Sequence, residues 1–326
     1  MVDSSFSAEH VWIAGSTDSP SSFSPSTTWQ ERWLGRVTLT LAVVTLFLMA
    51  LGSATRVMNA GLSCPDWPLC YGEIVPAQQM NLQVFLEWFH RLVASSLGLV
   101  VLIVTGLSWF YRQRLAPWIP MAMSWALGLV MVQGLLGGLT VTELLRFDIV
   151  TAHLGTGLLF FATLLTIALC LLPVATASSV SRMGSLPWLA GLAALLVYGQ
   201  SLLGGLVASQ WAVHQCLGSQ QLCAVMNSHL LGVIPASLAT LVVVVSTLVK
   251  AIRHPLPPLL PKLALLGGGL LIGQLALGWA TFRLHLQVEP LTVAHQAIGA
   301  ALLGSLVALT VLAWREQRRS FRALAV

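Results

Sequence analysis

Charged side chains are scarce in this chain of 326 residues. It has 16 Lys and Arg and 11 Asp and Glu, which together make up 8% of the sequence. Soluble proteins carry about 25% charged residues. Because 56% of the residues are hydrophobic, too few polar side chains remain to cover a surface in water. This excludes a soluble enzyme and indicates that most of the chain faces lipid.

A basic stripe and a cysteine framework are also missing. The formal net charge is +5, and no basic cluster occurs before the last dozen residues. Nucleic-acid binding needs clustered Lys and Arg, so we expect no nucleic-acid partner. Five cysteines are too few for a disulfide scaffold. The basic excess is more simply explained by membrane orientation.

Long hydrophobic runs are what the sequence does have. Stretches of about 20 apolar residues recur between short polar breaks, as crossing a hydrocarbon core of about 30 Å requires. The expected spans are 35–56, 84–109, 118–140, 149–173, 187–208, 226–250, 262–282 and 292–314. Helices satisfy their own backbone hydrogen bonds in lipid, so an all-α integral membrane protein is predicted. Residues 1–33, rich in Ser, are predicted to be a disordered cytoplasmic tail.

The distribution of basic residues predicts the orientation of the spans. The tails and the loops after the second, fourth and sixth spans hold 12 of the 16 Lys and Arg residues. The opposite face keeps Arg56, Arg91, Arg146 and Arg283. Because Lys and Arg are retained on the cytoplasmic side during insertion, both termini are expected to be cytoplasmic.

The sequence also repeats itself. Residues 51–53, followed by two cysteines, resemble 203–205, followed by two more; residues 133–137 resemble 274–278, and 150–155 resemble 291–296. The repeat predicts two four-helix bundles, 34–175 and 186–315. Each half holds an even number of spans, so the halves should share one orientation and be related by a pseudo-twofold axis along the membrane normal.

Four histidines follow the repeat. His90, His153, His229 and His295 each lie near the expected external end of an even-numbered span. A single membrane histidine usually makes an interhelical hydrogen bond, but four at repeat-related positions indicate function. A facing pair can ligate a haem iron through both axial positions, or one histidine can be displaced when a substrate haem enters.

One carboxylate breaks the symmetry. Glu87 precedes His90 by three residues and so shares its helix face, whereas no carboxylate stands at that distance before His229. Beside a haem, Glu87 could hold a proton or stabilise positive charge at the macrocycle edge. The alternative is an interfacial glutamate paired with Arg91 or Arg56.

Four of the five cysteines form two close pairs in expected external loops. Cys64 with Cys70 and Cys216 with Cys223 lie where oxidation is permitted, so each pair is expected to form a disulfide, either structural or redox-active. Cys170 stands alone near the cytoplasmic end of its span and is interpreted as a packing residue.

The segments 61–70 (Gly-Leu-Ser-Cys-Pro-Asp-Trp-Pro-Leu-Cys) and 87–91 (Glu-Trp-Phe-His-Arg) resemble the heme A synthase family. The likeness covers residues 35–314. It implies a multi-pass protein of a bacterial cell membrane that oxidises the C8 methyl of heme O to a formyl group, giving heme A for terminal oxidase assembly.

The resemblance also implies roles for the site residues. Substrate haem would bind at His90 and His153, with Glu87 as the catalytic carboxylate, and His229 and His295 would ligate a haem b cofactor that serves electron transfer. Cys64 with Cys70 would be a redox or transfer element. Heme O synthase, oxidase assembly factors and a further copy of the chain are partners compatible with this reading.

Three other classes of protein remain open. A noncatalytic di-haem electron-transfer cytochrome needs only the four histidines, although Glu87 argues against two equivalent sites. A transporter would place its site near the membrane midplane with broken helices, whereas these histidines cluster toward the outer face. A thiol-quinone oxidoreductase would depend on the cysteine pairs alone.

Overall fold

The computed structural model describes residues 28–175, 183–208, 220–284 and 288–324, without the side chains of 220–223 and 323–324. Eight helices within these ranges are long and apolar enough to cross a membrane. They are Trp29–Val57 (α1), Leu82–Phe110 (α2), Trp118–Thr142 (α3), Phe147–Leu171 (α4), Leu186–Val207 (α5), Gln220–Arg253 (α7), Leu259–Arg283 (α8) and Glu289–Leu324 (α9). The predicted all-α class with eight spans is confirmed. A pseudo-twofold axis between the halves stays a prediction.

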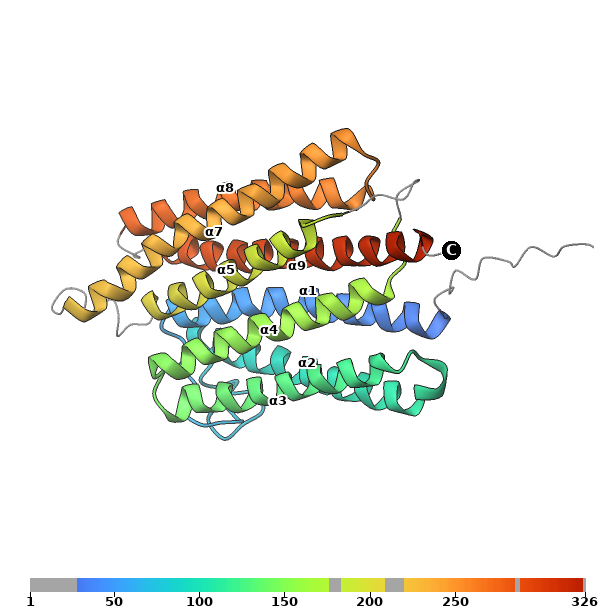
Figure 1. Cartoon of the computed structure of the whole chain (residues 1–326). Coiled ribbons are helices and arrows are strands. Elements are labelled where there is room, and N and C mark those ends of the chain that lie inside the picture. The colour runs from blue at the N-terminus through green and yellow to red at the C-terminus, as the bar shows by residue number, and fades with distance from the viewer. Residues whose placement is uncertain (1–27, 176–182, 209–219, 285–287, 325–326) are drawn as a thin grey trace, which may run out of the picture.

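The helices form two groups that are consecutive in the sequence (Figure 1). In the first, α1 packs on α2, α2 on α3, α3 on α4 and α4 back on α1; in the second, α5, α7, α8 and α9 close in the same cyclic order. Contacts between the groups run through α1, α4, α5 and α9. Since α9 packs on both α1 and α4 as well as on its own group, it is a wall common to both.

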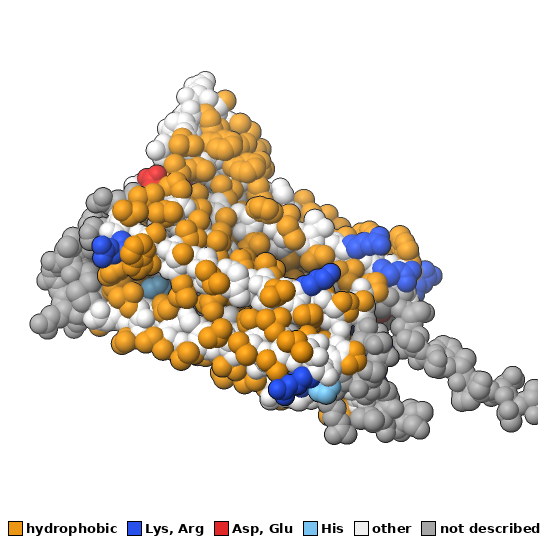
Figure 2. All heavy atoms as spheres, turned by 90° about the horizontal axis from the view of Figure 1, so that it is seen from above, with side chains coloured by type: hydrophobic (Ala, Val, Ile, Leu, Met, Phe, Trp, Pro, Cys, Tyr) orange, Lys and Arg blue, Asp and Glu red, His pale blue; other side chains and the backbone are white. Residues whose placement is uncertain are grey.

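Several buried threonines inside the spans are satisfied by their own helix. Thr45, Thr240 and Thr247 are buried, and each hydroxyl donates to the carbonyl four residues earlier at 2.7–2.8 Å. Such a bond removes the cost of placing a hydroxyl in an apolar environment without a partner from another helix. The apolar surface then faces outward: hydrophobic side chains cover most of the face in Figure 2, where few charged ones are visible.

Two helix ends differ from the expected spans. The prediction that the tail extends to residue 33 is wrong for its last five residues, because a capping box between Thr28 and Glu31 begins α1 at Trp29. Residues 1–27 lie outside the described part of the chain. At the other end, α9 continues past 314, and buried Glu316 and Ser320 show that this polar extension packs on the protein.

Candidate functional site

Each of the four predicted histidines packs against a glycine of the preceding helix. A Cβ atom added to Gly52, Gly204 or Gly278 would lie 2.9–3.0 Å from Cε1 of His90, His229 or His295 respectively, and one added to Gly137 would lie 3.3 Å from Cε1 of His153. A contact under 3.0 Å is too short for a real Cβ, so the rings of His90 and His295 occupy space that only a glycine leaves open, and those of His229 and His153 leave little room for a larger residue. The same glycine–histidine contact therefore recurs four times, twice in each half.

His90 and His153 line one cavity of about 370 Å³ in the first half. Helices α1 to α4 all contribute to its wall, and Gln296 of α9 contributes from the second half. Nδ1 of His90 and Nδ1 of His153 are buried without a hydrogen-bond partner. Each of these two residues thus lines the cavity and keeps one ring nitrogen that no described group satisfies, which fits a site for a ligand of imidazole.

Glu87 also lines this cavity and is only 4% exposed. Its Oε1 accepts a hydrogen bond from Arg91 at 2.5 Å, and its Oε2 accepts one from the backbone N–H of Cys64 at 2.8 Å. Of the two arginines expected as partners, Arg91 is thus the one that pairs with it. The two donors fix the orientation of a buried carboxylate beside His90.

Arg91 holds the loop above the cavity as well. Its Nη1 donates to the carbonyls of Asp66 and Leu69, both at 2.6 Å, and its Nη2 donates to the carbonyl of Cys64 at 3.3 Å. The loop is closed by the Cys64–Cys70 disulfide, with Cα atoms 4.7 Å apart. The first predicted disulfide is confirmed. It lies next to the Glu87–Arg91 ion pair, because the backbone of Cys64 hydrogen-bonds to both side chains.

Asp66 organises the turn inside this loop. Its carboxylate accepts hydrogen bonds from the backbone N–H groups of Gly72 at 2.8 Å and Tyr71 at 2.6 Å. These donors lower the pKa of Asp66 below its ordinary value, with the Gly72 bond contributing most. Trp67 of the same loop reaches down to α3, where a Cβ added to Gly138 would lie 3.2 Å from the indole ring.

Arg56 is the second arginine in the cavity wall. It lies in the last turn of α1 and its Nη2 donates to the carbonyl of Gly205 on α5 at 3.1 Å. No carboxylate in the described part of the chain forms an ion pair with it.

Glutamines accompany three of the histidines. Nε2 of Gln133 lies 3.4 Å from Nε2 of His153, and Gln274 is placed identically relative to His295, at the same distance. Gln200 lies 3.0 Å from Nδ1 of His229. The repeat signal already contained the first two glutamines as residues of matching segments, but only the fold shows that they adjoin histidines.

In the second half, His229 and His295 lie on α7 and α9, each packed on a glycine of the preceding helix. Nδ1 of His295 is buried without a partner, so this ring, like those of His90 and His153, keeps an unsatisfied nitrogen, whereas Nδ1 of His229 lies beside Gln200. Cys216 and the side chain of Cys223 lie outside the described residues, and the second disulfide stays a prediction. Cys170 is free and half-buried.

No group of three or more His, Cys, Asp and Glu side chains in the described ranges could hold a metal ion by itself. Two histidines are enough for a haem, because the porphyrin supplies the other four ligands of the iron.

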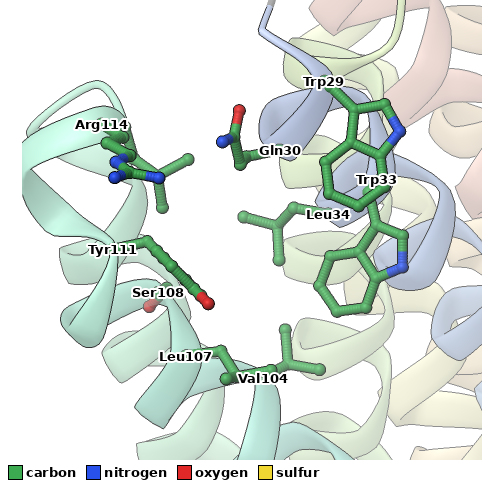
Figure 3. A pocket seen from close by; sticks show the side chains of 10 residues that line it. Trp29, Gln30, Trp33, Leu34, Val104, Leu107, Ser108, Tyr111 and Arg114 are labelled. Atoms are coloured by element: carbon green, nitrogen blue, oxygen red, sulfur yellow. The ribbon is translucent and has the colours of Figure 1, made fainter.

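A further cavity of about 420 Å³ lies between the start of α1 and the end of α2 (Figure 3). Trp33 and Leu34 face Tyr111 and Ser108 across it, with Arg114 at its edge. Its wall contains none of the four histidines, and it lies at the opposite end of α2 from His90. It is therefore separate from the candidate site.

The fold and the site define a multi-pass helical membrane protein with two glycine-packed histidines in each half, of which those of the first half line a cavity together with a buried carboxylate. The chain belongs to the COX15-CtaA family of cytochrome oxidase assembly proteins, which its residues 35–307 match.

Individual relatives agree with this assignment. The chain is 30% identical to "Heme A synthase" of Shewanella oneidensis, over 90% of this chain and 99% of the relative. It is also similar to "Heme A synthase" of Bacillus pumilus (29% identity, 40% of this chain and 43% of the relative) and of Bacillus mycoides (30% identity, 43% and 44%). The first of these matches spans nearly the whole of both chains.

Proposed function

We propose that this protein converts heme O to heme A by oxidising the C8 methyl group to a formyl group. In this proposal His90 and His153 bind the substrate haem, while His229 and His295 ligate a resident haem b. The full-length similarity to a heme A synthase supports the reaction class. The observation that carries the assignment of the halves is the cavity in which His90, His153 and Glu87 meet.

The reaction needs two successive hydroxylations of one carbon. Each replaces a C–H bond by C–OH. If water supplies the oxygen, two electrons and two protons leave; if dioxygen supplies it, two electrons and two protons are consumed and one water is released. The gem-diol formed after the second hydroxylation loses water to leave the aldehyde. The resident haem b, held by His229 and His295, would supply one-electron redox chemistry. The remaining requirements are to place the methyl group, to exclude bulk water and to stabilise charge.

Glu87 meets the electrostatic requirement. It is buried, it lines the substrate cavity, and donors from Arg91 and Cys64 hold it in one orientation. A carboxylate offers about four acceptor positions, so two hydrogen bonds leave capacity toward the cavity. A preorganised negative group stabilises positive charge that develops at the methyl carbon as it is oxidised, and it can accept the proton released there.

A structural role for Glu87 has its own support, since the same carboxylate links Arg91 to the backbone of Cys64. A noncatalytic di-haem cytochrome is the rival for the whole protein, and the recurrence of glycine–histidine contacts in both halves favours it. A direct measurement of heme A distinguishes the structural role of Glu87, and also the di-haem cytochrome, from the proposed function.

The test is to express the protein with a heme O supplier in cells that make no other heme A, and to separate the haems of acid-acetone extracts. The wild type should yield heme A. Glu87→Ala should retain haem b and accumulate heme O, with heme A reduced by about 100-fold or more, in line with the loss of one preorganised electrostatic group. Glu143→Ala is the matched control, because Glu143 is an exposed carboxylate that also pairs with an arginine, Arg146.

Two outcomes would contradict the proposal. A wild-type protein that carries haem but forms no heme A would be an electron-transfer cytochrome. Wild-type levels of heme A from Glu87→Ala would leave the carboxylate with only its structural role at the Cys64–Cys70 loop.

A further inference from the structure

Arg56 stands in an environment that is unusual for an arginine. It is partly buried in the last turn of a membrane span, it lines the cavity of His90 and His153, and its Nη2 donates to one backbone carbonyl, that of Gly205. A carbonyl oxygen carries only partial charge. A cation in a low-dielectric site is costly unless an anion accompanies it, and ionisable groups inside spans commonly mark function.

Arg91, the other arginine in the cavity wall, has a full set of hydrogen-bond acceptors for its two terminal nitrogens. Its two terminal nitrogens donate to three carbonyls and to the carboxylate of Glu87. Glu87 is thereby paired with Arg91, and no described carboxylate pairs with Arg56. The cavity wall contains two arginines and one glutamate, so one positive charge is left over, and Arg56 carries it.

The repeat shows that the fold itself does not require this arginine. Gly52 and Gly204 are equivalent, because each packs on the histidine of the following helix. Four residues beyond them stand Arg56 and Ala208. The second half therefore ends the corresponding helix with a methyl group, and the charge at this position is specific to the first half.

We propose that Arg56 binds a propionate of the substrate haem. The inference rests on the function proposed above and adds the group that recognises the acidic edge of the porphyrin. A propionate is a carboxylate, and an arginine binds carboxylates with short, charge-assisted and often bidentate hydrogen bonds. Bound at Arg56, it supplies the anion that the cavity lacks.

Anchoring a propionate also positions the reacting carbon. In heme O the C8 methyl and one propionate are substituents of the same pyrrole ring. An anchor at that propionate, together with axial histidines, leaves the porphyrin little freedom to rotate in its plane. Arg56 thus acts as a positioning residue that helps to present the C8 methyl to Glu87 in the same cavity.

The test compares heme O with its dimethyl ester, in which both propionates are neutral. Purified protein carrying its haem b is titrated with each compound, and binding is followed by the change in the Soret absorption. The wild type should bind heme O about 10- to 100-fold more tightly than the ester, as expected for a charge-assisted hydrogen bond. Arg56→Gln should weaken the binding of heme O by a similar factor and leave the binding of the ester nearly unchanged.

Two further variants complete the design. Arg56→Lys keeps the charge and should retain part of the preference for the free acid, which protects the test if Arg56→Gln does not fold. Arg283→Gln is the matched control, because Arg283 lies in the last turn of α8 and stacks on Trp279 away from the cavity; it should behave as the wild type.

Equal binding of acid and ester by the wild type, or an unchanged preference in Arg56→Gln, would overturn the role of Arg56. The function proposed above fails in a different way. It fails if heme O does not change the wild-type spectrum, or if the change persists in His90→Ala and His153→Ala proteins, whatever Arg56 does.

Discussion

The two halves of this protein share the packing of histidine rings on glycines, but the residues around these histidines differ in charge and polarity. In both, a histidine near the start of the second helix packs on a glycine of the first, and a histidine of the fourth helix packs on a glycine of the third. In the first half Arg56, Glu87 and Arg91 surround this arrangement; the equivalent residues of the second half are Ala208, Met226 and Leu230.

The difference also runs in the other direction. Gln200 lies 3.0 Å from Nδ1 of His229 and donates to the backbone carbonyl of the same residue at 2.7 Å, whereas the equivalent position in the first half is Leu48. A hydrogen bond at Nδ1 fixes the orientation of a ligating imidazole. The second half thus holds His229 at Nδ1, and the first provides charge around its cavity. The function proposed above accounts for this difference with a permanent ligand in the second half and a substrate in the first.

The largest effect that would break this comparison is expected from the histidines themselves. His229→Ala and His295→Ala should each abolish the low-spin haem b spectrum of the purified protein, because a six-coordinate iron loses an axial ligand. His90→Ala and His153→Ala are the controls and should keep that spectrum. The assignment of haem b to the second half is wrong if folded His229→Ala and His295→Ala proteins retain the unaltered spectrum.

A smaller effect is expected from filling the space beside a histidine. A Cβ at position 204 would lie 3.0 Å from Cε1 of His229, so Gly204→Ala should displace the ring and lower haem b occupancy by about tenfold, the effect of overpacking by about 1–3 kcal/mol. Gly52→Ala should weaken heme O binding instead and leave haem b in place. Occupancy is measured as haem per protein.

Gly199→Ala is the control on the same helix, because nothing lies within 4 Å of a Cβ added there. Alanine is the better helix former, so a loss of haem in Gly204→Ala alone would not come from a weaker helix. Equal haem content in the Gly204→Ala and Gly199→Ala proteins would show that the ring does not need the close contact.

The smallest effect concerns the loop that only the first half shows within the described residues. The pKa of Asp66 is lowered from its ordinary value of 3.8 by the N–H groups of Gly72 and Tyr71. The stabilisation of the turn by the Asp66 carboxylate is therefore complete above pH 3.8. It is lost as the pH falls through the lower pKa that Asp66 has in the folded state. Hydrogen exchange at Tyr71 and Gly72 should accelerate there, once the intrinsic effect of pH is corrected.

Asp66→Asn should show the faster exchange already at neutral pH, without a further change on acidification. If protection in the wild type is equal on both sides of this transition, the carboxylate does not hold the turn.

Much of the fold follows from composition, because a run of about 20 apolar residues has few alternatives to a membrane helix. The ends of the helices are harder to predict from the sequence. The signal that begins α1, Thr28 followed by Glu31, is present in the sequence as a capping box, but the Ser-rich context obscures it. The extension of α9 carries no apolar signal, since it depends on contacts such as that of Arg315 with the carbonyl of Leu172 on the end of α4.

For the site, the internal repeat singles out the histidines because they recur in both halves. It singles out Glu87 because the second half has no carboxylate at the equivalent position. It does not show which arginine pairs with Glu87. That depends on the loop folding back over α2, so that Arg91 meets the carbonyls of Cys64, Asp66 and Leu69. Arg56 meets Gly205 only because α1 and α5 adjoin across the two halves.

The shared helix α9 has a consequence for how the two sites relate. His295 turns toward Gly278 of its own half, while the next residue, Gln296, lines the cavity of the other. Neighbouring residues on a helix point about 100° apart, so one rod serves both sites with two of its faces. The relative position of these two side chains is then set by one continuous helix and not by the docking of the two halves. In the proposed function, both haem sites thus share this helix, and a shift of α9 along its axis would move His295 and Gln296 together.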